Sequence, residues 1–237
     1  MTILAIETST PVCSVALKTT CRTVSRDARD ATTLHADNLL VWIDDLLEQC
    51  AISRTAITGI AVSCGPGTFT GVRSGISIAQ AIALGLGCPV LAVSSLHVLA
   101  MRADSTASSV MVCTDARIGE VYVGFFQRNQ DMSFDACGVE RLCTPEDVVV
   151  HAGCWYGVGN GFAIADNFLQ EHWASQLQHV DASAIPEAKD LCAIAAHPAQ
   201  SSRWIDPQAL TPVYLRQQVA LTIAQRRMLQ HKRQNAP

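Results

Sequence analysis

The sequence has 237 residues, a formal net charge of −4, and 49% hydrophobic residues, but only 5% aromatic residues. This length is enough for one large domain or two of ordinary size. The mild charge argues against wholesale electrostatic binding of nucleic acid, and the excess of small aliphatic residues favours an α/β protein whose helices pack closely on a sheet.

The first half of the chain predicts strands followed by alternating helices and strands. Three short strands separated by polar breaks indicate antiparallel hairpins, and unbroken apolar runs further on are typical of buried parallel strands. The helix after the glycine-rich loop is closed by Gly85 and Gly87. The expected order is β-β-β-α-β-α-β-α, over 3–8, 12–18, 22–27, 34–50, 59–64, 71–86, 89–94 and 96–103.

The second half repeats this order more faintly. We expect strands at 109–116, 120–128 and 139–143, a helix at 144–151, an apolar-to-glycine transition at 155–161, and a helix at 186–197. The 144–151 helix would open at Thr144, with Pro145 at its first position. Such a duplication predicts two related lobes, 1–104 and 105–237, with a cleft between them.

The loop GPGTFTGVR, residues 65–73, has two interpretations. It is no P-loop, because none of the three lysines is near it, and no dinucleotide fingerprint, because Gly71 stands one position late. Gly65 and Gly67 could still present backbone N–H groups to a phosphate at a helix N-terminus. Alternatively, the glycines permit a tight turn and close packing.

The first strand of each half ends in an acidic residue, which is Glu7 in the first half and Asp115 in the second. With Gly65 and Gly67 they are candidates for a weak nucleotide site. Arg117 stands two positions after Asp115, so this pair could equally be a structural ion pair. Efficient phosphoryl transfer is not expected from this set.

Metal and hydrolytic chemistry find little support in the sequence. No two of the seven histidines are four residues apart, and no two of the ten cysteines have C-x-x-C spacing, so we expect buried, reduced thiols in a cytosolic protein. GVRSG places its serine one position late for a nucleophile elbow. Cys64 ends an apolar strand, which should raise the pKa of its thiol and leave it inert.

The helix after the loop carries a smooth strip, because Gly71, Gly75, Ala79 and Ala83 recur every four residues. The strip could admit a partner helix closely, or it could pack on the chain's own sheet and turn Ile78 and similar residues outward. The 34–50 helix is apolar on more than one side, which also suggests a helical interface.

The remaining signals concern the two ends of the chain. The N-terminus lacks a basic region and cleavage site, and no apolar run approaches the ~20 residues of a membrane span, so a cytoplasmic protein is expected. From Pro207 onward there is no acid but five basic residues, and 214–229 predicts a helix. This tail could touch the phosphates of a nucleic acid or simply be solvated.

Several segments together resemble the TsaB (YeaZ-like) family. They are ILAIETSTPVCSVAL, HADNLL, GPGTFTGVRSGISIAQAIALGL, VLAVSSLHVLA, DARIGEVYVGFF and LTPVYLR, which span 3–216. The resemblance implies two ribonuclease-H-like lobes of the actin/hexokinase/Hsp70 (ASKHA) superfamily, with mixed sheets flanked by helices. It also implies a role in forming threonylcarbamoyladenosine beside the tRNA anticodon.

The resemblance further implies a non-catalytic subunit that pairs with its paralogue TsaD, or with a second copy, through a four-helix bundle. The ATPase TsaE would join the pair, and tRNA would be reached through the complex. No cofactor of its own is implied, apart from weak ATP or ADP binding in the complex. The expected partner-binding residues are Leu39, Leu40, Ile43, Leu47, Gly71, Gly75, Ile78, Ala79 and Ile82. Two rival hypotheses are an independent nucleotide hydrolase or kinase using Glu7 and Asp115, and a peptidase.

Overall fold

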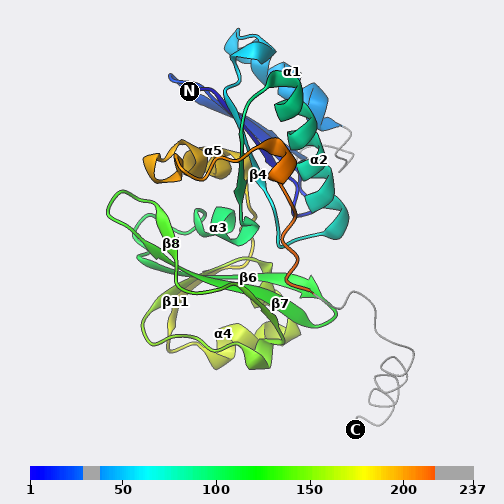
Figure 1. Cartoon of the computed structure of the whole chain (residues 1–237). Coiled ribbons are helices and arrows are strands. Elements are labelled where there is room, and N and C mark those ends of the chain that lie inside the picture. The colour runs from blue at the N-terminus through cyan, green and yellow to red at the C-terminus, as the bar shows by residue number, and fades with distance from the viewer. Residues whose placement is uncertain (29–37, 217–237) are drawn as a thin grey trace, which may run out of the picture.

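Two mixed β-sheets form the frame of the protein, as shown by a computed structural model that describes residues 1–28 and 38–216 (Figure 1). The first sheet has the strand order β3-β2-β1-β4-β5. β1 pairs antiparallel with β2 and parallel with β4, so the sheet changes direction at β1. The bounds are β1 Ile3–Glu7, β2 Ser14–Lys18, β3 Thr23–Asp27, β4 Gly59–Ser63 and β5 Val90–Val93.

The second sheet repeats this topology. Its order is β11-β10-β6-β7-β8, with β9 also paired to β7, and β6 is antiparallel to β7 but parallel to β10. The bounds are β6 Ser109–Arg117, β7 Glu120–Arg128, β8 Phe134–Ala136, β9 Arg141–Cys143, β10 Trp155–Val158 and β11 Leu177–Asp181. The predicted fold class, two mixed sheets flanked by helices, is confirmed.

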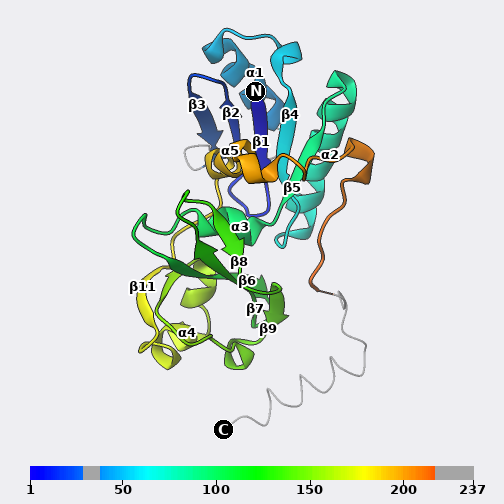
Figure 2. The same cartoon turned by 60° about the vertical axis from the view of Figure 1, so that its left-hand side comes forward.

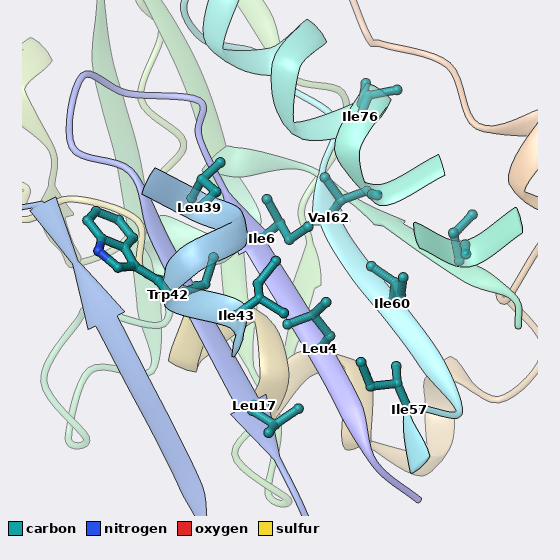
Figure 3. Packing of buried hydrophobic residues seen from close by; sticks show 14 of the residues in the cluster. Leu4, Ile6, Leu17, Leu39, Trp42, Ile43, Ile57, Ile60, Val62 and Ile76 are labelled. Carbon is teal, nitrogen blue, oxygen red and sulfur yellow. The ribbon is translucent and has the colours of Figure 1, made fainter. Parts of the chain in front are cut away.

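Alternation along β1 distributes its side chains between two cores, because successive residues of a strand point to opposite faces. Leu4 and Ile6 belong to a cluster with helices α1 (Leu39–Cys50) and α2 (Phe69–Leu86), as Figure 3 shows. Ile3 and Ala5 belong to a cluster on the other face, with α5 (Ala188–Ala196). All five residues of β1 are therefore buried.

Two helices cross between the lobes. α3 (Ser95–Ala100) follows β5 in the chain, yet it packs on β6 and β7 of the second sheet. α5 comes from the second half and packs on β1 and β2 of the first sheet. Figures 1 and 2 show both helices between the sheets. The predicted boundary between residues 104 and 105 therefore separates the sheets but not the helices, and as a domain boundary it stays a prediction.

Helix α2 begins at Phe69, two residues earlier than expected, and ends at a left-handed Gly87. Its 18 residues are long and apolar enough to pass a test of length and composition for a membrane span, which on its own is weak support for one. In the structure, Val72, Ile76 and Ala83 are buried in the core with β4, while Phe69 and Leu84 on other sides of the helix are exposed.

The second lobe departs from the sequence prediction at several places, one of which is the unexpected short strand β8. The prediction of a helix over 144–151 is wrong, because only a 3-10 turn, Pro145–Asp147, forms there. Val148 and Val150 then alternate with an exposed Val149 in extended backbone, because a β-branched run favours an extended chain over a helix. The polar edge strand β11 and the five-residue helix α4 (Phe168–His172) were not expected.

Two predicted segments lie wholly or partly outside the described residues. The helix expected over 34–50 is described from Leu39 onward, and His35 falls outside. The tail beyond Arg216, with most of the predicted 214–229 helix, also falls outside.

Candidate functional site

A cavity of about 210 Å³ lies between the two sheets. The turn after β1, the glycine loop and the start of α3 line it from the first half of the chain, and the end of β6 lines it from the second. Gly67 and Asp115 are among its lining residues, whereas Glu7 and Gly65 are not. The structure thus brings together only two of the four nucleotide-site candidates at one accessible surface.

Glu7 is sealed beneath the cavity. Its side chain is fully buried, and its Oε1 accepts a hydrogen bond from the Ser9 N–H at 2.7 Å. Burial raises the pKa of this carboxyl, and the hydrogen bonds from Ser9 offset only part of the effect. A magnesium ion binds carboxylates that it can reach, and the Glu7 carboxyl has no exposed surface in this structure.

Asp115 is engaged by its own hairpin. Its Oδ1 accepts a hydrogen bond from the Arg117 N–H at 2.7 Å, and its Oδ2 lies 3.3 Å from the Arg117 guanidinium. The Asp115 N–H donates to the Asn160 side chain at 3.0 Å. The ion pair that the sequence left open is therefore present, and a nucleotide role for Asp115 stays a prediction.

The loop glycines make room for the turn that follows β1. A Cβ on Gly67 would lie 2.4 Å from the Ser9 carbonyl oxygen, and one on Gly71 would lie 2.0 Å from the Thr8 carbonyl oxygen. Both distances are shorter than real Cβ contacts, so only glycine fits. The Thr68 N–H also donates to the Ser9 carbonyl at 2.8 Å. The loop therefore serves close packing, and binding of a phosphate by its backbone N–H groups stays a prediction.

The small-residue strip of α2 faces the chain's own sheet. A Cβ on Gly75 would lie 2.2 Å from the Thr8 hydroxyl oxygen and 3.6 Å from a methyl group of Val62. Ala79 and Ala83 are fully buried in the same core. Of the two alternatives for the strip, packing on its own sheet is the one observed.

A wide groove of about 680 Å³ lies between α1 and the outer side of α2. Leu40 and Phe69 are large apolar residues on it, with 56% and 52% of their surfaces exposed. The groove is lined by Leu40, Phe69, Thr70, Arg73, Ser74, Ser77 and Ile78. An apolar groove with several polar side chains is the kind of surface that protein partners cover.

The predicted partner-binding set divides between the core and this groove. Leu40 and Ile78 line the groove, while Gly71 and Ile82 are partly exposed. Five of the predicted partner-binding residues are buried in the chain's own core, so their prediction as contact residues is corrected. They are Leu39, Ile43, Leu47, Gly75 and Ala79.

Sequence reasoning missed five of the seven residues that line the groove, Phe69 and Arg73 among them. The Arg73 guanidinium carbon lies 3.7 Å from the centre of the Phe69 ring, and its Nε donates to the Tyr214 hydroxyl at 2.6 Å. The spacing of four residues places Phe69 and Arg73 on one helix face, which was the available signal. Tyr214 is 141 residues from Arg73 in the chain, so no local pattern could connect them.

Comparisons with known proteins place the chain in a family. A family model described as "TsaD: tRNA N6-adenosine threonylcarbamoyltransferase" matches residues 28–223. The Escherichia coli protein named "tRNA threonylcarbamoyladenosine biosynthesis protein TsaB" is 35% identical over 229 residues, which cover 93% of this chain and 96% of that protein. The chain belongs to the TsaB family.

Further TsaB relatives agree with this assignment. The protein of the same name from Haemophilus influenzae is 30% identical and covers 92% of this chain and 95% of its own length. The structure of YeaZ from Pseudomonas aeruginosa matches with a TM-score of 0.78 and 36% identity, over 90% of this chain and 99% of that one. The TsaB family and its actin-like, two-lobed fold, both expected from the motifs, are confirmed.

The structure places the groups that the sequence analysis considered for metal binding and hydrolysis in this TsaB chain. Within residues 1–28 and 38–216, no three His, Cys, Asp or Glu side chains gather as metal ligands would. Ser74 lies inside α2 instead of on a strand-to-helix turn. Burial raises the pKa of the Cys64 thiol to about 11, and this thiol lies 3.3 Å from the Val93 carbonyl oxygen, to which it donates. A protonated, buried thiol is a poor nucleophile.

Proposed function

We propose that this chain is the non-catalytic subunit of a tRNA threonylcarbamoyladenosine machine and that it docks its TsaD-type paralogue through the groove between α1 and α2. The named relatives belong to this biosynthesis. The observation that carries the docking proposal is the groove itself, where Leu40 and Phe69 leave about half of their surfaces uncovered. In this proposal the TsaE ATPase joins the pair in the cytoplasm, and tRNA is reached through the complex.

The lack of catalysis in this proposal is supported by the state of the candidate groups. Glu7 is sealed, Asp115 is paired with Arg117, and Cys64 is protonated. Each group serves the fold locally, so none is poised to abstract a proton or attack a substrate. The paralogue supplies the chemistry.

We also propose that ATP or ADP binds the isolated chain weakly at most. Its glycine loop is packed against the Thr8 and Ser9 carbonyl oxygens. Titration calorimetry with Mg-ATP tests this proposal: a micromolar dissociation constant that Asp115→Asn abolishes would support a nucleotide enzyme instead.

Co-purification with the TsaD-type paralogue from the same cell tests the docking proposal. Leu40→Glu places a carboxylate in the groove, and burying it under a partner should weaken capture by at least about tenfold. Val149→Glu is the matched control, because Val149 is 67% exposed and lies in the second lobe, away from the groove. Equal capture of both variants, with unchanged melting temperatures, would refute docking at this groove.

Two further measurements separate the alternatives. Light scattering of the chain alone determines whether the groove also pairs two copies, since Leu40→Glu should then convert a dimer to a monomer. Modification assays with each subunit omitted test the functional role. The chain alone should leave tRNA unmodified when given threonine, bicarbonate and ATP, and modified adenosine without the paralogue would overturn the proposal.

A further inference from the structure

A strap near the C-terminus, residues 206–216, runs from α2 to the β6–β7 hairpin (Figure 2). At its start, the Gln80 side chain donates hydrogen bonds to the carbonyl oxygens of Pro207 and Leu210, at 2.9 and 3.1 Å. Further along, the Val213 N–H donates to the Cys64 carbonyl at 2.8 Å. The strap is thus bonded along its length to the first lobe before it reaches the second.

The last residues of the strap touch both surfaces described above. The Tyr214 hydroxyl accepts a hydrogen bond from Arg73, and its ring stacks on Phe69 with 6.0 Å between ring centres. Two residues later, the Arg216 guanidinium lies 2.5 Å from the Glu120 carboxylate and donates to the Ala116 carbonyl at 3.0 Å. Phe69 and Arg73 line the groove, and Ala116 lines the cavity. Three consecutive residues therefore connect the two.

The hairpin that Arg216 holds has a strained backbone. Arg117 and Ile118 both have left-handed φ angles, +67° and +60°. This region is unfavourable for a β-branched residue, and such strain persists only where the surroundings enforce it. Ile118 is 71% exposed, so packing around its own side chain does little to enforce it. The pairing of β6 with β7 holds the hairpin, and Asp115 and Arg216 add hydrogen bonds to its backbone.

We propose that residues 214–216 act as a latch that couples the groove to the cavity. With Tyr214 seated on Phe69 and Arg73, Arg216 holds the hairpin in its strained form. When a partner displaces Tyr214 from Phe69 and Arg73, Arg216 is released and the hairpin relaxes, which changes the wall of the cavity. Only the identity of the molecule that fills the groove rests on the proposed function; the coupling itself is a property of the isolated chain.

Hydrogen–deuterium exchange on the full chain tests the latch without any partner. Arg216→Gln removes a charged hydrogen bond to the hairpin and should speed exchange of the amides of residues 115–120 by about tenfold or more. Phe69→Ala, at the other end of the latch, should speed the same amides about threefold. In the double variant, Phe69→Ala should add nothing, because the latch is already open.

Leu84→Ala is the matched control, since Leu84 lies on the same helix, is 53% exposed, and does not line the groove. It should leave hairpin exchange unchanged. The latch is refuted if Phe69→Ala leaves the exchange rates of the hairpin amides unchanged. It is also refuted if, in the double variant, the rate increases caused by Phe69→Ala and Arg216→Gln multiply. Glu120→Gln is the second variant if Arg216→Gln fails to fold. It removes the ion pair of Arg216 but keeps the hydrogen bond to the Ala116 carbonyl, so it should speed exchange of the hairpin amides by a smaller factor. Unchanged exchange in Glu120→Gln would also refute the latch. A failure of partner docking would appear only in the co-purification assay.

Discussion

Replacing Gly75 by alanine should destabilise the protein, although alanine is the better helix former. A Cβ at this position would lie 2.2 Å from the Thr8 hydroxyl oxygen, which donates a hydrogen bond to the Gly71 carbonyl at 2.8 Å. The new methyl group must displace that hydroxyl, because Thr8 is fully buried. The substitution therefore breaks a buried hydrogen bond and overfills the contact between α2 and the turn after β1.

The expected size of the effect follows from three contributions. Overpacking costs about 1–3 kcal/mol, and loss of the hydrogen bond costs about 1 kcal/mol. The higher helix propensity of alanine returns about 1 kcal/mol. The net loss in the free energy of unfolding is about 1–3 kcal/mol, which at this chain length lowers the melting temperature by roughly 2–12 °C.

Thr8→Ala should reverse the sign of the Gly75→Ala effect. Without the hydroxyl, the closest remaining contact of the new Cβ is the Cβ of residue 8 at 3.5 Å, an ordinary separation. In that background, Gly75→Ala should stabilise by about 0.5–1 kcal/mol through helix propensity. Gly85→Ala is the matched control, because nothing lies within 4 Å of its position on the same helix, and it should stabilise in either background.

Thermal unfolding followed by circular dichroism measures all of these variants. The reasoning is refuted if Gly75→Ala melts at or above the wild-type temperature, or if the effects of Thr8→Ala and Gly75→Ala simply add. Additivity would mean that the strip does not pack on the turn after β1, and a partner would again be the better explanation for it.

Three other predictions concern pH, thiols and backbone strain. Burial lowers the pKa of His97 from 6.5 to about 4. Because the unfolded chain binds the proton first, the free energy of unfolding should fall by about 3 kcal/mol as the pH drops through that interval. The loss should be smaller in His97→Gln, and equal pH profiles would contradict it. Iodoacetamide at pH 8 should modify the exposed Cys21 and Cys154 first. Burial raises the pKa of Cys192 to about 12, so this thiol should stay unmodified until the protein unfolds, and early labelling of Cys192 would count against its burial. Gly159→Ala should cost at least about 2 kcal/mol, since its φ is +108° and a Cβ would lie 2.3 Å from a main-chain oxygen of β6; an unchanged melting temperature would rule this out.

The sequence could predict features that depend on neighbouring residues. The apolar runs at 59–64 and 89–94 indicated the strands β4 and β5, and the paired halves indicated a duplicated topology. Motifs spread over 3–216 identified the family. The same local reasoning failed at 144–151, where helix-start signals at Thr144 and Pro145 competed with a β-branched run that the fold keeps extended.

Only the tertiary structure decided which surfaces are available for function. Helix α2 is apolar on several sides, so its sequence could not say whether the Gly71–Gly75 strip faces the sheet or a partner; the fit of Gly75 over Thr8 decides it. The same holds for α1, where Leu39 is core while its neighbour Leu40 lies in the groove. Contacts across long stretches of chain, such as Arg73 with Tyr214, arise from how the whole chain closes on itself. Periodicity records the spacing of side chains along one element, and it contains no information about which element will lie opposite.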